Sequence, residues 1–183
     1  MFSAKRVLLP VAALLLSSAP LACAEDIESR EGPGSDDRQL GVCNERYQAE
    51  GDSASDAEVD FDDWRVRKDH AGYEGDSYMD AGGQDGWLRL DYLTFAPGTY
   101  RMSIRYANGS GNGRPVTIRF NDDDETEFQM TFPPTGRWSN WQTVTREISP
   151  RYGIRNLTIE VDTTQGGPNI DAIELNAIEV NGC

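Results

Sequence analysis

Short segments in which apolar and polar side chains alternate fill most of the chain from residue 87 onwards. Alternation with a period of two places one set of side chains on each face of an extended strand. Turn-forming residues such as Pro97-Gly98 and Gly166-Gly167-Pro168 separate these segments. The pattern predicts strands at 87–93, 100–106, 116–120, 128–132, 141–148, 154–161 and 172–180. Since no stretch keeps a helical apolar period over three turns, we expect an all-β fold, an antiparallel two-sheet β-sandwich or jelly roll.

The first 24 residues have the pattern of an export signal. Lys5 and Arg6 precede an apolar stretch at 7–16, and Ala22-Cys23-Ala24 supplies small residues for cleavage. The apolar stretch is too short to span a bilayer. We therefore expect residues 1–24 to be a signal peptide and the mature protein to be secreted or periplasmic. The alternative is a lipoprotein attached to a membrane through Cys23.

Residues 25–42 are rich in Gly, Pro, Ser and charge and contain no aromatic residue, which predicts a polar linker. Residues 43–183 then suffice for one domain with its own core. Cleavage after Ala24 would leave two cysteines, Cys43 and Cys183. An even pair in an exported chain favours a disulfide, which requires the ends of the domain to lie within about 7 Å of each other. The alternative is a free thiol at Cys43 in the linker.

The charge of the chain limits its partners. Without the two basic residues of the signal, 15 basic residues stand against 31 acidic ones, a net charge of −16 with the single histidine neutral. Nucleic acid and anionic membranes both select basic surfaces, so neither is expected as a partner. Cations are favoured instead.

Carboxylates near both ends of the domain suggest a calcium site. Glu50 and Asp52 are two residues apart and would share one face of an extended strand, and Asp171 opens the last predicted strand. Calcium takes six to eight oxygen ligands, so backbone carbonyl groups or water would complete such a site. The alternative is that Glu50 and Asp52 are ordinary solvated carboxylates. The acidic run 122–125 lacks the spacing of a calcium loop and predicts a solvated hairpin turn.

Aromatic residues in predicted loops suggest a sugar site. Trp138 follows Gly136-Arg137 in a loop, where a large exposed apolar side chain indicates a binding role. An aromatic ring can cover the apolar face of a pyranose, while amide and carboxylate groups select its hydroxyl groups. Trp141 opens a predicted strand and is expected in the core.

Six sequence elements in a fixed order resemble the carbohydrate-binding modules of families 6 and 35. They are an Ala-Glu pair at 49–50, Gly-Tyr-Glu-Gly-Asp-Ser-Tyr-Met-Asp at 72–80, Pro-Gly-Thr-Tyr at 97–100, Arg-Tyr-Ala-Asn at 105–108, Thr-Gly-Arg-Trp at 135–138, and Asn-Ile-Asp at 169–171. The resemblance covers residues 44–181 and implies a β-jelly roll, a structural calcium and a sugar site in the loops at one end. Such modules usually accompany a catalytic domain, which this sequence lacks.

The resemblance also implies roles for individual residues. Trp138 and Tyr78 match the pair that flanks the bound sugar, and Asn169 matches the amide that hydrogen-bonds it. Tyr73 and Asn108 lie in adjoining loops and are further candidates, while packing in a strand is the alternative for Tyr78. Glu50 and Asp171 match structural calcium ligands, and Asp52 stands where a second acidic ligand often lies.

The sequence offers little for catalysis. Its only histidine, His70, lies in a predicted loop and is expected to be exposed, and neither a Gly-x-Ser-x-Gly motif nor a zinc-binding spacing occurs. We therefore expect no enzyme, but a monomeric, exported module that binds a polysaccharide or oligosaccharide. The alternatives are a small jelly-roll glycan lyase or glycoside hydrolase, or an adhesion module of the cell envelope.

Overall fold

The computed structural model describes residues 43–51, 56–181 and 183. The predicted signal peptide, the whole of the predicted linker, and Asp52 lie outside the described residues. Among the described residues all regular elements are strands, and no helix has the length and apolarity to span a bilayer. The prediction of an all-β fold is confirmed.

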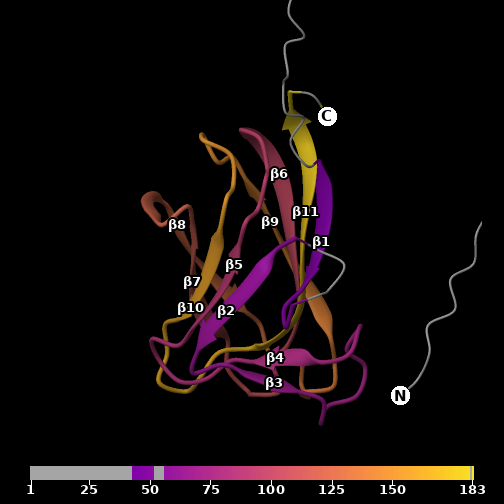
Figure 1. The fold of residues 1–183 in the computed structure, drawn as a ribbon. Coiled ribbons are helices and arrows are strands. Elements are labelled where there is room, and N and C mark those ends of the chain that lie inside the picture. Colours follow the sequence, from indigo (N-terminus) through magenta and orange to yellow (C-terminus); the bar gives the residue numbers. More distant parts are fainter. Residues whose placement is uncertain (1–42, 52–55, 182) are drawn as a thin grey trace, which may run out of the picture. The chain divides into compact units, whose positions relative to one another are not determined.

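The strands form two antiparallel sheets (Figure 1). The first sheet has the order β3-β4-β11-β6-β9, and β1 also pairs with β11; the second has the order β2-β5-β10-β7-β8. The strands are β1 Asn44–Gln48, β2 Glu58–Asp62, β3 Arg65–Arg67, β4 Tyr78–Asp80, β5 Trp87–Asp91, β6 Gly98–Ala107, β7 Arg114–Phe120, β8 Asp123–Phe132, β9 Gln142–Ile148, β10 Leu157–Val161 and β11 Asn169–Val180.

The apolar sets of the two sheets face each other and form one core. In β6 the buried residues Tyr100, Met102, Ile104 and Tyr106 alternate with more exposed ones, and β10 alternates in the same way. The inward side chains of both sheets belong to a single apolar cluster. The alternation of apolar and polar residues therefore reflects burial, because one face of each of these strands is removed from water.

Strand β11 organises the first sheet because it pairs with β1, β4 and β6. The register with β6 shifts between Ile170 and Ala172, so that Asp171 is the extra residue of a β-bulge. A bulge changes the direction of the residue that it inserts. The carbonyl oxygen of Asp171 accepts a hydrogen bond from the backbone N–H of Ala49 at 2.9 Å, which joins the start of β11 to the end of β1.

The two ends of the domain are covalently joined. Cys43 and Cys183 form the predicted disulfide, with their Cα atoms 5.6 Å apart. It closes a loop with a sequence separation of 140 residues. In the chain-entropy model a loop of this size stabilises the folded state by roughly 4–5 kcal/mol.

The loops that follow β6, β8 and β10 lie at one end of the sandwich. The β3–β4 loop reaches the same end, where His70 stacks on Trp138 and the carbonyl oxygen of Ala71 accepts a hydrogen bond from Trp141. In Figure 1 this is the lower end, marked by β3 and β4. We call it the loop end. Residues 68–77, 108–113, 133–141 and 162–168 meet there.

Candidate functional site

The loop end gathers five aromatic side chains from distant parts of the sequence. Three are the predicted Tyr73, Tyr78 and Trp138; the other two are His70 and Trp141. Tyr78 lies at the centre of this aromatic cluster. Its ring centre is 5.6 Å from that of Tyr73, 5.2 Å from that of Trp141 and 5.9 Å from that of His70.

His70 lies between the two rings that the resemblance assigns to the sugar. Its imidazole is nearly parallel to the ring of Tyr78, with an angle of 20° between the planes, and to that of Trp138, with an angle of 14° and 6.5 Å between centres. The expectation of an exposed loop histidine was therefore wrong, since the side chain is partly buried by these contacts.

Tyr78 is almost completely covered, with 1% of its surface exposed. Its hydroxyl group donates a hydrogen bond to Oδ1 of Asp69 at 2.9 Å. Burial, followed by this hydrogen bond, raises the pKa of the Tyr78 hydroxyl, while the same bond lowers the pKa of the Asp69 carboxyl. This hydrogen bond joins the ring of Tyr78 to Asp69, the residue that precedes His70.

Trp138 is partly exposed and held by its surroundings. A Cβ atom added to Gly109 would lie 2.5 Å from Cγ and Cδ1 of Trp138, so the ring lies directly against the glycine backbone. The guanidinium carbon of Arg114 is 5.6 Å from the ring centre. Arg114 also donates to the carbonyl oxygens of Gln165 and Gly166, which connects Trp138 to the β10–β11 loop.

Trp141 differs from its prediction. It immediately precedes β9, is only half-buried, and does not belong to the core cluster between the sheets. Its Nε1 donates to the carbonyl oxygen of Ala71 at 3.0 Å, and its ring contacts Tyr78 edge-on. Because these partners lie in the loop end, Trp141 supports the aromatic cluster rather than the core.

The two predicted amides are both buried but differ in their surroundings. Asn169 is 2% exposed and opens β11, where it is paired with Asp80 of β4 and Ala107 of β6. Asn108 is fully buried, and its Nδ2 donates to the carbonyl oxygens of Asn112 and Phe132. The amide of Asn108 thus holds its own loop in place and has no face open to a ligand.

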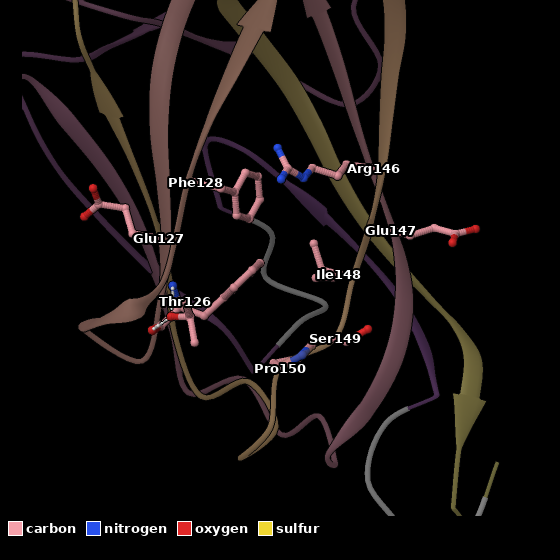
Figure 2. Close-up of a pocket in the computed structure, with 9 residues that line it drawn as sticks. Thr126, Glu127, Phe128, Arg146, Glu147, Ile148, Ser149 and Pro150 are labelled. Atoms are coloured by element: carbon pink, nitrogen blue, oxygen red, sulfur yellow. Dashed lines mark hydrogen bonds between the residues drawn. The ribbon is translucent and has the colours of Figure 1, made fainter.

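A hollow of about 400 Å³ lies beside Trp138 in the β8–β9 loop, lined by Thr135, Gly136, Arg137, Ser139 and Asn140. A second hollow, of about 280 Å³, opens between β8 and β9 at the edge of the sandwich (Figure 2). There the guanidinium of Arg146 lies 4.0 Å above the ring of Phe128. Since Arg146 covers the aromatic face of that hollow, the loop end is the better candidate for a sugar.

The predicted metal ligands Glu50 and Asp171 meet at the segment 74–77. Oε1 of Glu50 accepts a hydrogen bond from the backbone N–H of Ser77 at 3.1 Å, and both carboxylate oxygens of Asp171 accept one from that of Glu74 at 3.1 Å. Burial raises the pKa of both carboxyls, and the negative charge of Asp171 raises that of Glu50 further. Glu50 was expected on a strand, but β1 ends at Gln48 and Glu50 lies in the turn that follows.

Two buried oxygen atoms beside this segment have no hydrogen-bond partner: Oε2 of Glu50 and Oε1 of Gln48. The amide of Gln48 lies against Gly75, since a Cβ atom there would be 3.2 Å from the amide carbon. Uncompensated buried oxygens cost free energy, and a hard cation accepts such ligands. The described residues contain no group of three or more His, Cys, Asp and Glu side chains placed to hold a metal. Two carboxylates and an amide oxygen are the donors here.

Gln48 and His70 were missed from the sequence. Gln48 is two residues before Glu50 and shares its side of the chain, so the alternation that linked Glu50 to Asp52 could have included it. No sequence signal could have placed His70 between Tyr78 and Trp138, because that contact depends on how two separate loops pack.

Comparison with known proteins identifies the family. The sequence model of carbohydrate binding module family 6 matches residues 56–181. The chain belongs to this family. The module also resembles a family 35 carbohydrate-binding module from Clostridium thermocellum, with 25% identity and a TM-score of 0.63 over 75% of this chain and all of that one.

A family 35 module from Paenibacillus barcinonensis is 28% identical, with a TM-score of 0.61 over 73% of this chain and 99% of that one. An exo-β-D-glucosaminidase from Amycolatopsis orientalis is 31% identical over 112 residues, which are 60% of this chain and 11% of the relative. The module therefore spans about a tenth of that relative's length. The resemblance to families 6 and 35 is confirmed.

Proposed function

We propose that the protein is an exported, monomeric, non-catalytic module that binds a polysaccharide or oligosaccharide at the aromatic cluster, with a structural calcium beside it. The single observation that carries this proposal is the stack Trp138–His70–Tyr78 at the loop end of a family 6 module. Trp138 supplies the accessible aromatic face, and the neighbouring hollow supplies the polar groups of Arg137, Ser139 and Asn140. Aromatic faces and a few fixed polar groups are what pyranose recognition requires.

His70 adds a requirement to this proposal. Tyr78 cannot offer its ring to a sugar while it is 1% exposed beneath His70. We propose that the sugar takes the place of the imidazole between Trp138 and Tyr78, so that the loop 68–77 rearranges on binding. The observed binding free energy then equals the favourable free energy of the sugar contacts reduced by the free energy needed to displace His70.

The calcium would be held by Glu50, Asp171 and Gln48, with backbone carbonyl groups or water completing its shell. Bound calcium would supply positive charge to the buried carboxylate of Asp171 and the half-buried one of Glu50, and partners for the two oxygens without a hydrogen bond. It would thereby fix the segment 74–77, which leads directly into Tyr78. Asp52 lies outside the described residues and stays a proposed additional ligand.

The test combines a glycan array, with and without calcium, and a search for released products. We expect binding without reducing-end or unsaturated product, and loss of binding in Trp138→Ala but not in Ile178→Ala, which changes an exposed apolar residue of β11. Product release would assign the protein to an enzyme class, and unchanged binding by Trp138→Ala would exclude the aromatic cluster as the site.

The single histidine makes the displacement directly observable. The imidazole C–H signals of His70 should be shifted by the ring currents of Tyr78 and Trp138 in a ¹H–¹³C NMR spectrum of a protein without a histidine tag. Saturating sugar should move these signals towards the values of a free histidine. Signals that stay unchanged while the sugar binds would show that His70 keeps its place.

A further inference from the structure

The end of the sandwich opposite to the loop end carries two strongly exposed aromatic rings. Tyr92 is 70% exposed and Tyr152 is 66% exposed, more than any other large hydrophobic side chain among the described residues. Tyr92 follows β5, and Tyr152 lies between β9 and β10. Both connections are at the end away from β3 and β4 (Figure 1).

A backbone frame holds these two segments together. The N–H of Leu93 donates to the carbonyl oxygen of Arg155 at 2.8 Å, and Phe95 and Ile154 exchange two hydrogen bonds at 3.0 and 3.1 Å. The side chains of Leu93, Phe95 and Ile154 are buried in the core. Since these three side chains point into the core, those of the neighbouring residues Thr94 and Arg155 are directed towards solvent.

The outward side chains form one surface of mixed character, which we call the tyrosine face: Tyr92, Thr94, Tyr152 and Arg155, all of which are exposed. A hollow of about 260 Å³ lies within it, lined by Thr94, Tyr152 and Arg155 above a floor of buried apolar residues. Aromatic rings beside hydroxyl and guanidinium groups suit the surface of a sugar chain.

The backbone of Tyr92 is held in a costly conformation. Its φ angle of 61° lies in the left-handed region, which a bulky side chain rarely adopts. The hydrogen-bonded frame that begins at Leu93 keeps it there. Strain of this kind concentrates at functional sites, where the surrounding structure fixes a side chain in a needed position.

The charge of the tyrosine face is opposite to that of the protein. Arg155 is exposed and makes no ion pair with another described residue, and the guanidinium of Arg151 lies 5.3 Å from the ring centre of Tyr152. In the adjacent turn, Asn121 accepts a hydrogen bond from the backbone N–H of Arg155, and Asp122 pairs with Arg89, with Nη2 and Oδ2 2.9 Å apart. In a chain of net charge −14, two exposed arginines beside exposed aromatic rings favour an anionic ligand.

We propose that the tyrosine face is a second carbohydrate-binding surface, selective for acidic polysaccharides that carry carboxylate or sulfate groups. Tyr92 and Tyr152 contact the sugar rings, and Arg155 binds the anionic group, together with Arg151 over the ring of Tyr152. The proposal rests on the proposed carbohydrate-binding function but not on the site at Trp138, since the two surfaces lie at opposite ends of the sandwich.

Affinity electrophoresis with matched polysaccharides tests the proposal. The probes are polygalacturonate and its methyl ester, and dextran sulfate and dextran, so that each anionic polymer has a neutral partner with the same backbone. The wild type should be retarded more by the anionic member of at least one pair. Tyr152→Ala and Arg155→Gln should each weaken that retardation about tenfold. Comparison of the two pairs distinguishes carboxylate from sulfate.

The controls separate the two surfaces. Ile178→Ala removes another exposed hydrophobic side chain and Arg65→Gln another exposed arginine, and neither should change retardation. Trp138→Ala should abolish binding at the loop end and leave retardation by the anionic polymer intact. Loss of that retardation in Trp138→Ala but not in Tyr152→Ala or Arg155→Gln would overturn the tyrosine face and retain the loop site. Absence of retardation by both anionic polymers would overturn it as well.

Discussion

The guanidinium of Arg105 pairs with the completely buried carboxylate of Asp171 and, from the same position, covers the ring of Trp141 at 5.4 Å from its centre. It also donates to the carbonyl oxygen of Gly72 at 2.8 Å and pairs with Glu74 at 3.2 Å. One side chain therefore connects the candidate metal site to the aromatic cluster. Changes at Asp171 should therefore affect the proposed sugar site through Arg105.

Removal of calcium tests the metal site. A ligand that binds only the folded protein stabilises it by RT ln(1 + [L]/Kd), about 2.7 kcal/mol at a hundredfold excess over Kd. Chelation should therefore lower the melting temperature without abolishing the fold, because the disulfide still joins the ends. Asp171→Ala and Glu50→Gln should each remove the response to chelator, whereas Glu179→Gln, an exposed acid on the same strand, should keep it. A wild-type melting temperature that is the same with and without EDTA would refute the proposed calcium site.

The contact between Gly109 and Trp138 predicts a sensitive glycine. Gly109→Ala should push the Trp138 ring away from the loop, because the new methyl group would overlap it. We expect a loss of about tenfold in sugar affinity, with a shift in tryptophan fluorescence. Gly111→Ala is the matched control, since no atom lies within 4 Å of its added Cβ. Equal affinities of the two variants would show that Trp138 does not depend on this contact.

Replacing His70 should reveal the cost of displacing it. His70→Ala leaves Tyr78 uncovered and should bind the sugar more tightly than the wild type, by a factor of several. Lys68→Ala, an exposed change in the same loop, should have the wild-type affinity. Calorimetric titration measures both. Weaker binding by His70→Ala would instead make the imidazole part of the sugar site.

Asp122 provides a pH-dependent prediction. Its hydrogen bonds to Arg89 lower the pKa of the Asp122 carboxyl, so the folded state gains stability from this group above the pKa of an unfolded aspartate, about 3.9. That contribution disappears as the pH falls through the lower, folded pKa. The side chain of Asp122 is 56% exposed, so the effect should be about 1 kcal/mol or less.

The measurement is urea unfolding of the wild type and Asp122→Asn between neutral pH and about pH 2. Asparagine tolerates the left-handed backbone of this position, where φ is 53°. The wild type should be more stable near neutral pH, and the difference should shrink towards zero in acid. A difference that is independent of pH would exclude the Arg89 pair as its source.

The sequence predicted the strands of the core well and the strands at the margins poorly. The segments that became β5, β6, β7 and β10 bury one face, so their alternation is strong. Strands β2 and β3 are mostly exposed, and β3 and β4 have three residues each, which gives too little contrast or length for the pattern to register. Boundaries also shifted, as at β10, which begins at Leu157 rather than at residue 154.

The sequence predicted which residues belong to the candidate site better than it predicted how those residues contact one another. Tyr73 and Tyr78 do come together, and His70 joins Tyr78 to Trp138, because the loops 68–77 and 133–141 meet at the loop end. That His70 covers Tyr78, that Asn108 serves its own loop, and that Trp141 lies outside the core all depend on packing between loops. Packing between loops does not produce a repeating pattern of apolar residues, so it could not be predicted from the sequence.

The disulfide also determines how the module responds to mechanical force. If the polypeptide is stretched from both sides, tension passes from Cys43 to Cys183 through the two sulfur atoms, and the strands between them bear no load. After reduction the load would fall on β1 and β11, which are antiparallel and begin and end beside the two cysteines. The hydrogen bonds between β1 and β11 would then break one after another, starting at the end next to the cysteines. The oxidised module is thus suited to holding a sugar polymer while its own chain is under tension.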